Sequence, residues 1–162
     1  MKASPFSSQP NLFVTHVVDN GLFTLYAVPV SRFMLLYLLT CGGYLFYWSY
    51  RHWASYKAAT GVNIMPVMRG LLWPFYLLSL FELVQRGLDK AGHIHGWYPE
   101  TRGLLILLAF MLSALIALFF DRPSDTAFVW GVDAVLVAGS VMLFRGAQRA
   151  INLLGDSAKK AV

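Results

Sequence analysis

The sequence predicts an all-α integral membrane protein with about four transmembrane helices, preceded by a short N-terminal β-hairpin. Three observations support this fold class. Hydrophobic residues make up 57% of the 162 residues and charged residues only 13%, whereas about 25% charged is ordinary for a soluble domain. Long apolar runs recur along the chain. Aromatic and basic residues follow the first run, as they do where a helix leaves a bilayer.

The N-terminal part precedes the apolar runs. Residues 1–11 are polar, lack the apolar core of a signal peptide, and are predicted to be disordered. Residues 12–19 and 22–28 are rich in β-favouring side chains, and Asn20-Gly21 between them suits a type I′ turn. We therefore expect a β-hairpin lead over residues 12–30, with an amphipathic surface helix as the alternative.

The rest of the chain is predicted to be helical. The helical membrane domain is expected to cover residues 31–155, before a C-terminal tail over residues 156–162. Its four helices are predicted at residues 31–60, 66–88, 103–120 and 126–154. The second is the weakest span, because only 12 uncharged residues separate Arg69 from Glu82 and Pro74 lies between them. It either crosses the membrane with Glu82 shielded or is half-inserted.

The basic residues predict an orientation. Four spans put both termini on one face, which then holds nine of the 13 Lys and Arg residues. The other face holds Arg51, Lys57, Arg69 and Arg122. The positive-inside rule therefore predicts cytoplasmic termini.

Two kinds of helix contact are expected inside the membrane. Small residues allow close helix packing, and the candidates are Gly42, Gly43, Ala109, Ser113, Ala117, Ala134 and Ala138. Acidic residues in apolar helices are costly unless they are paired or functional. We expect Asp133 to pair with Arg69, because both lie near the start of their helices in the same leaflet, and Glu82 to pair with Arg86 four residues later.

The end of the first helix is the candidate lipid-binding region. Amphipathic rings and basic side chains favour the headgroup layer, and they gather at Tyr47, Trp48, Tyr50, Arg51, His52, Trp53, Tyr56 and Lys57.

Metal, cofactor and catalytic signals are weak. His93 and His95 are only two candidate ligands, which falls short of a metal constellation. No nucleophile elbow, metalloprotease motif or phosphate loop occurs in the sequence. No cofactor is predicted, and Cys41 is the single cysteine, so no intrachain disulfide can form.

One segment resembles a known family. The runs V-P-V-S-x-F, T-C-G-G-Y-L-F-Y-W-S-Y-R-H-W and G-V-N-I-M-P-V-M-R-G-L-L fall within residues 26–82. They resemble a group of small bacterial inner-membrane proteins with a Y-W-x-Y-[RK]-x-W signature after the first membrane helix, a domain of unknown function. The resemblance implies an inner-membrane location and carries no activity.

Three function classes remain open. The leading prediction is a non-catalytic accessory or interaction subunit of a membrane complex, whose partners are anionic lipid and other membrane proteins or a second copy. Nucleic acid is not expected, because the basic residues are scattered between apolar runs. The alternatives are a small oligomeric channel or transporter that uses Asp133, and a membrane-embedded lipid-modifying enzyme.

Overall fold

The protein is built from helices. A computed structural model describes Phe23 and residues 25–93, 96–120 and 122–160. In this part of the chain the elements are α1 (Val30–Leu39), α2 (Tyr44–Thr60), α3 (Pro66–Leu71), α4 (Trp73–Lys90), α5 (Pro99–Phe119), the 3-10 turn η1 (Pro123–Asp125) and α6 (Thr126–Lys160).

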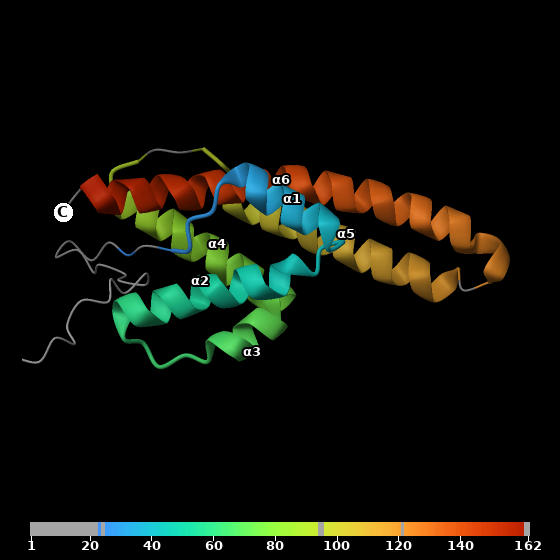
Figure 1. Cartoon of the computed structure of the whole chain (residues 1–162), viewed down its shortest axis with the longest axis horizontal. Helices are drawn as coiled ribbons and strands as arrows, with labels where there is room; N and C mark the ends of the chain where they lie inside the picture. The colour runs from blue at the N-terminus through green and yellow to red at the C-terminus, as the bar shows by residue number, and fades with distance from the viewer. Residues whose placement is uncertain (1–22, 24, 94–95, 121, 161–162) are drawn as a thin grey trace, which may run out of the picture.

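The molecule has two parts of different character (Figure 1). The distal hairpin consists of residues 111–119 of α5 and 126–135 of α6, which extend beyond every other described helix and join through η1. The body consists of α1 to α4, residues 99–110 of α5 and residues 136–160 of α6. Because α6 is 35 residues long, it runs through both parts and connects them.

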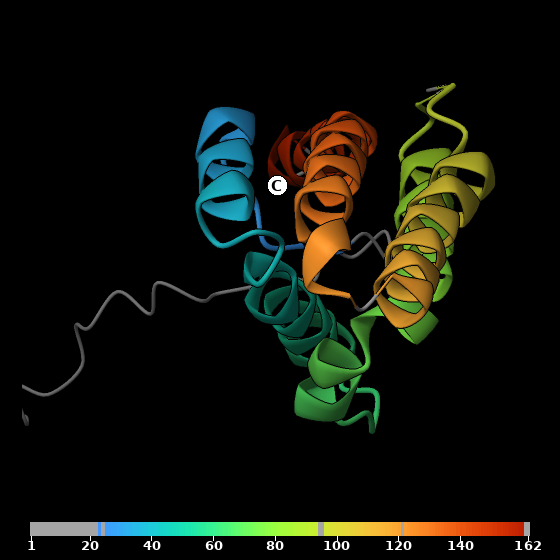
Figure 2. The same ribbon diagram turned by 90° about the vertical axis from the view of Figure 1, so that its right-hand side faces the viewer.

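The chain approaches the distal hairpin three times (Figure 1). Helix α1 runs towards the hairpin and α2 runs back; the short α3 then runs towards the hairpin again and α4 runs back. Only the third pair, α5 and α6, continues into the hairpin. Viewed from the hairpin tip, α6 lies between α1 and α5, with α2 and α3 beneath them (Figure 2).

A glycine-containing turn breaks the predicted first helix in two. Cys41 and Gly42 have φ angles of 47° and 87°, in the left-handed region that glycine adopts at little cost. The turn is held by the Thr40 hydroxyl, which accepts a hydrogen bond from the Tyr44 N–H at 2.8 Å. The 30-residue helix expected over residues 31–60 is therefore replaced by helices of 10 and 17 residues.

The predicted second helix is also broken. Helix α3 ends before Leu72, and Pro74 stands in the first turn of α4, where its missing N–H removes no helical hydrogen bond. At Pro74 the chain therefore passes from α3 to α4, instead of kinking within one helix. The short α3 packs on α2.

The fold class prediction is wrong in two respects. Only two helices of the described part, α5 and α6, are long and apolar enough to cross a membrane, instead of four. No strand forms in the described residues either. The first strand and the turn of the predicted β-hairpin lie outside them.

The physical reason is that the segment before α1 packs on helices. Phe23, Leu25 and Val28 are buried, and the ring of Phe23 meets that of Tyr56 edge-on at 5.2 Å. The Val28 carbonyl accepts a hydrogen bond from the Asn152 side chain at 2.9 Å, in place of a strand partner. Apolar residues in this segment thus fill gaps between helices.

The core lies in the body and is rich in aromatic rings. Phe144 of α6 is fully buried. Four rings surround it with centroids between 5.7 and 6.2 Å away: those of Phe33, Tyr37, Trp48 and Trp73. These contacts attach α1, α2 and α4 to the same point of α6.

We expect Gly70→Ala to destabilise the body. A Cβ atom at Gly70 would lie 2.7 Å from the Tyr50 Cβ and 3.1 Å from the Phe46 carbonyl oxygen of α2, so the backbones would have to separate, at a cost of about 1–3 kcal/mol. Thermal unfolding in detergent measures this loss.

Gly139→Ala is the matched control. A Cβ atom there meets nothing within 4 Å, and alanine favours a helix over glycine by up to about 1 kcal/mol. Equal thermal stability of the two variants would contradict the close approach of α2 and α3.

Candidate functional site

The surface of the distal hairpin is apolar on all sides. Large side chains are exposed along both helices, among them Met111, Leu118, Phe119, Trp130 and Val135, the last with 71% of its surface accessible. In the most apolar stretches of α5 and α6, only 11% and 17% of the residues are buried. The core helix of a soluble protein is mostly buried, so these helices do not have that character.

The lengths of the two helices fit a bilayer. From Arg102 to Phe119 the rise is about 26 Å, and from Thr126 to Arg145 about 29 Å, at 1.5 Å per residue. The hydrocarbon layer is about 30 Å thick. Charged residues therefore bound an apolar slab of suitable thickness at both of its faces.

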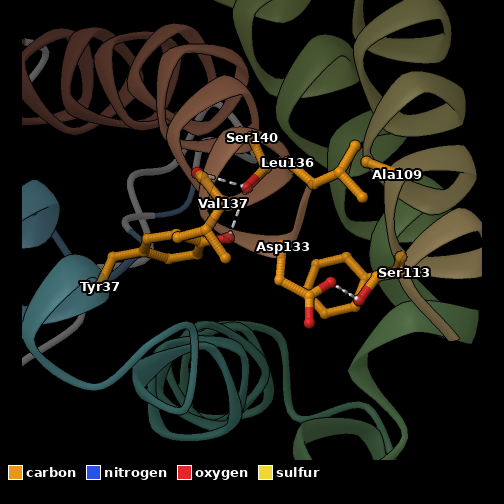
Figure 3. A pocket seen from close by; sticks show the side chains of 8 residues that line it. Tyr37, Ala109, Ser113, Asp133, Leu136, Val137 and Ser140 are labelled. Carbon is orange, nitrogen blue, oxygen red and sulfur yellow. Dashed lines mark hydrogen bonds between the residues drawn. The ribbon is translucent and has the colours of Figure 1, made fainter. Parts of the chain in front are cut away.

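A polar notch lies inside this slab, where α1, α5 and α6 meet (Figure 3). We define the polar notch as the hydroxyl or carboxylate groups of Tyr37, Ser113, Asp133 and Ser140. Together with apolar side chains they line a cavity of about 40 Å³. The carboxylate of Asp133 points towards Ser113, and Tyr37 reaches in from α1.

The hydrogen bonds of the polar notch have a defined direction. The Ser113 hydroxyl donates to Asp133 Oδ1 at 2.6 Å. The Ser140 hydroxyl donates to the Val137 carbonyl oxygen at 2.8 Å. Tyr37 and Ser140 share a 2.6 Å bond in which either hydroxyl can donate; when Ser140 gives its one proton to Val137, Tyr37 is the donor.

Arg69 does not lie beside Asp133. Its guanidinium stacks over the rings of Trp53 at 4.3 Å and Tyr76 at 5.0 Å, a cation–π arrangement that suits arginine. Arg69 belongs to the separate helix α3 on the far side of α2, whereas Asp133 bonds Ser113. The structure therefore does not bring the two expected partners together.

The other expected ion pair is confirmed. Arg86 Nη2 lies 3.1 Å from Glu82 Oε2. Both side chains are largely exposed, and a surface pair of this kind adds little stability.

The aromatic-basic region at the end of the first predicted helix has two faces. Trp48, His52 and Trp53 are buried in the body, while Tyr47 and Tyr50 are exposed. Tyr56 is half-buried and Lys57 exposed. Lys57 donates to the Ile64 carbonyl oxygen at 2.9 Å. Half of this region is thus core, and the exposed half is what lipid can contact.

Arg51 stacks on Tyr47 of the exposed half and on Tyr26 of the segment before α1. Its guanidinium lies 4.5 Å from the Tyr26 ring centroid and 5.7 Å from that of Tyr47. With Arg69 this makes two arginines that use aromatic faces, as expected at a membrane interface.

Of the small residues predicted to allow close helix packing, only some lie against another part of the protein. Ala109 and Ser113 line the notch against α6, and Gly42 is buried beside the Tyr37 ring. Gly43, Ala117, Ala134 and Ala138 are exposed.

A buried, hydrogen-bonded series of polar side chains in the body is not predicted from the sequence. Trp48 Nε1 donates to Gln148 Oε1 at 2.7 Å, Gln148 Nε2 donates to Asn152 Oδ1 at 2.9 Å, and Asn152 reaches the Val28 carbonyl. The spacing of Gln148 and Asn152, four residues apart on one helical face, was the available signal.

No metal site is formed in the described part of the chain, where no three His, Cys, Asp or Glu side chains are grouped to hold an ion. His93 is exposed, and His95 lies outside the described residues.

We expect acidification to destabilise the body through His52. Burial, with a smaller contribution from the Arg51 charge, lowers the pKa of His52 from 6.5 to about 3. Between these values the unfolded chain binds a proton that the folded protein does not, so stability falls as pH falls below about 6.5, by up to about 1.4 kcal/mol per pH unit.

Chemical denaturation in detergent at several pH values measures this slope, and His52→Phe should flatten it. A wild-type stability that is constant between pH 6.5 and 4.5 would show that His52 finds a proton-accepting or solvated environment.

Comparison with known proteins gives no match: no protein-family model, no curated protein and no solved structure resembles this chain significantly. Function must therefore be inferred from the geometry of the molecule itself.

Proposed function

We propose that the protein is a non-catalytic interaction subunit of a bacterial inner-membrane complex, anchored by the α5–α6 hairpin and in contact with anionic lipid. The observation that supports this most directly is the division of the molecule into an apolar distal hairpin and a charged body. In this arrangement the hairpin crosses the bilayer once in each direction, and the body and the C-terminal end of α6 lie on one side.

The basic residues support a cytoplasmic body. Arg122 lies at the hairpin tip next to η1. The other Lys and Arg residues of the described part belong to the body: Arg32, Arg51, Lys57, Arg69, Arg86, Lys90, Arg102, Arg145, Arg149, Lys159 and Lys160. Positive charge favours the cytoplasmic side, and this partition is more uneven than the one expected for four spans.

The first helix supports partial insertion of the body. Leu35, Leu38 and Leu39 of α1 are exposed, and 10 residues measure only about 15 Å, half of the hydrocarbon layer. The α1–α2 turn then lies near mid-membrane, and its neighbour α3 exposes Val67 and Leu71. Both pairs of short helices would dip into the cytoplasmic leaflet around the base of the hairpin.

Arg102 is positioned to contact lipid phosphate at this base. Its Nε donates to the Trp97 carbonyl and its Nη1 to the Leu143 carbonyl at 3.3 Å. Gly146 leaves the space for this side chain, since a Cβ there would meet the guanidinium. No carboxylate pairs with Arg102 among the described residues, so its remaining N–H groups can serve a lipid phosphate.

The interaction role follows from an open face of α6 that begins in the hairpin and continues into the adjoining part of the body. Gly131 and Gly139 are exposed, and a Cβ atom at either would meet nothing within 4 Å. Together with Ala134 and Ala138 they leave a face on which another helix can approach closely. Two helices alone also give a small anchor, which association with a partner would stabilise.

A second candidate function is ion or proton transport by an oligomer. The oxygen atoms of the polar notch, including the Asp133 carboxylate, favour it. A flux of protons or sodium ions into liposomes that Asp133→Asn abolishes would establish transport, and flux equal to that of empty liposomes would exclude it.

We expect Thr60 and Ser124 to lie on opposite sides of the membrane. Thr60 is exposed at the end of α2 in the body, and Ser124 is exposed in η1 at the tip. Single cysteines at these positions, in a Cys41→Ser background, are labelled with a membrane-impermeant maleimide in right-side-out and inverted vesicles. Ser124→Cys should label only from outside and Thr60→Cys only from the cytoplasmic side.

Labelling of both positions from the same side would contradict the single-hairpin anchor. Release of the protein from membranes by alkaline carbonate would contradict membrane insertion itself.

A further inference from the structure

The geometry of the polar notch points to a partner of defined chemistry: we propose that Asp133 binds a lysine side chain on a transmembrane helix of a different protein. This inference rests on the proposed function, because it requires the hairpin to cross the membrane. It adds the chemical identity of the group that the partner must present.

The first step is depth. Asp133 lies seven residues from Thr126 and 12 from Arg145, which is about 10 Å and 18 Å along α6. In a hydrocarbon layer of about 30 Å, this is near the middle. An ionisable side chain there is costly unless it is paired or faces water, and it marks a functional contact.

The second step is that the described chain supplies no cation. The ion pair found in the described part joins Arg86 to Glu82, and Arg69 stacks on Trp53 and Tyr76. The one hydrogen bond of the Asp133 carboxylate comes from Ser113 to Oδ1. The second carboxylate oxygen, Oδ2, has no partner among the described residues.

The third step is the direction of the hydrogen bonds. Ser113 gives its proton to Asp133, Ser140 gives its proton to Val137, and Tyr37 gives its proton to Ser140. In this arrangement every hydroxyl proton in the polar notch is used, and what remains there are acceptor oxygens. The negative end of the α1 dipole lies at the same place, since α1 ends two residues after Tyr37.

A site in which only acceptor oxygens remain needs a ligand group that donates hydrogen bonds and accepts none. A lysine ammonium has three donors, no acceptor and a compact charge. An arginine fork pairs best with two free carboxylate oxygens, and Asp133 has one oxygen already bonded. The cavity of about 40 Å³ accepts a group of water size, since about 10–15 Å³ measured in this way holds one water.

The cation cannot come from the hairpin of a second copy at this depth. No Lys or Arg occurs in residues 103–121 or 123–144, and none occurs in residues 33–50 around the α1–α2 turn. Arg69 is already stacked on Trp53 and Tyr76 of its own chain, so we assign the cation to another protein. Access is open, because the Asp133 side chain is partly exposed and only α5 and α6 continue from the notch towards the tip (Figure 1).

Association with designed helices tests this inference. The full chain, labelled through Ser124→Cys in a Cys41→Ser background, is reconstituted in phosphatidylcholine–phosphatidylglycerol vesicles. Energy transfer is measured to synthetic transmembrane Leu-Ala helices that carry Lys, Gln or Leu at the centre. We expect the Lys helix to bind about 5- to 30-fold more tightly than the Leu helix, as for other polar contacts between membrane helices.

Asp133→Asn is the matched variant, because its amide oxygen can still accept the Ser113 hydrogen bond while the charge is lost. It should reduce Lys-helix binding to the Leu-helix level without changing thermal stability by more than Ser113→Ala does. A Lys moved two turns from the centre should also lose the gain.

Any of three outcomes would overturn the inference. The wild-type protein could bind the Lys and Leu helices equally, or the Lys and Gln helices equally, or the Asp133→Asn variant could bind the Lys helix as tightly as the wild type does. A sodium-dependent rise in thermal stability that needs Asp133, without a preference for the Lys helix, would instead identify a free cation as the occupant. Carbonate extraction of the same vesicles separates these results from failure of the anchor, since only the latter releases the protein.

Discussion

The packing of aromatic rings around Phe144 is the contact on which the rest of the molecule depends. Rings from α1, α2 and α4 meet this one side chain of α6, so the three short elements are fixed at a single level of the long helix. Buried rings of this size contribute several kcal/mol each to the body. The distal hairpin has no comparable cluster, and its large side chains face outwards. The C-terminal part of α6 is therefore packed against other helices, whereas its N-terminal part exposes large apolar side chains, as a helix in lipid does.

The parts that the sequence predicts well are those determined by long uninterrupted patterns. Helices α5 and α6 begin within four residues of their expected starts, because their apolar runs contain few helix-breaking residues. The predictions fail where a local pattern competes with tertiary packing. Gly42 adopts a left-handed conformation and ends α1, although the flanking apolar residues continue a helical pattern. Val28 has strand-like neighbours, yet its carbonyl is bound by Asn152, 124 residues away. Such distant partners leave no trace in local periodicity.

The sequence predicts only part of the candidate site, for a related reason. The depth of Asp133 follows from counting along a helix, and this singles out the residue. Its neighbours depend on lateral placement, which is decided by how α3 and α1 pack. Arg69 was expected at the right depth but belongs to a helix on the other side of α2, over Trp53. Tyr37 was not expected at all, because a single continuous first helix gave no reason to place it beside Ser140.

Two hydrogen-bonded sets of polar groups in the described part of the chain differ in what they leave unpaired. In the body, each donor from Trp48 through Gln148 to Asn152 ends on an acceptor of the same chain, so this set stabilises the fold and requires nothing from outside. In the polar notch the donors are all used while acceptors remain, including one oxygen of a carboxylate. Asp133 is only partly exposed, so leaving one of its carboxylate oxygens unpaired costs free energy that a bound partner can recover. The direction of that imbalance, an excess of acceptors around Asp133, is the reason for our proposal that the group bound there is a donor with positive charge.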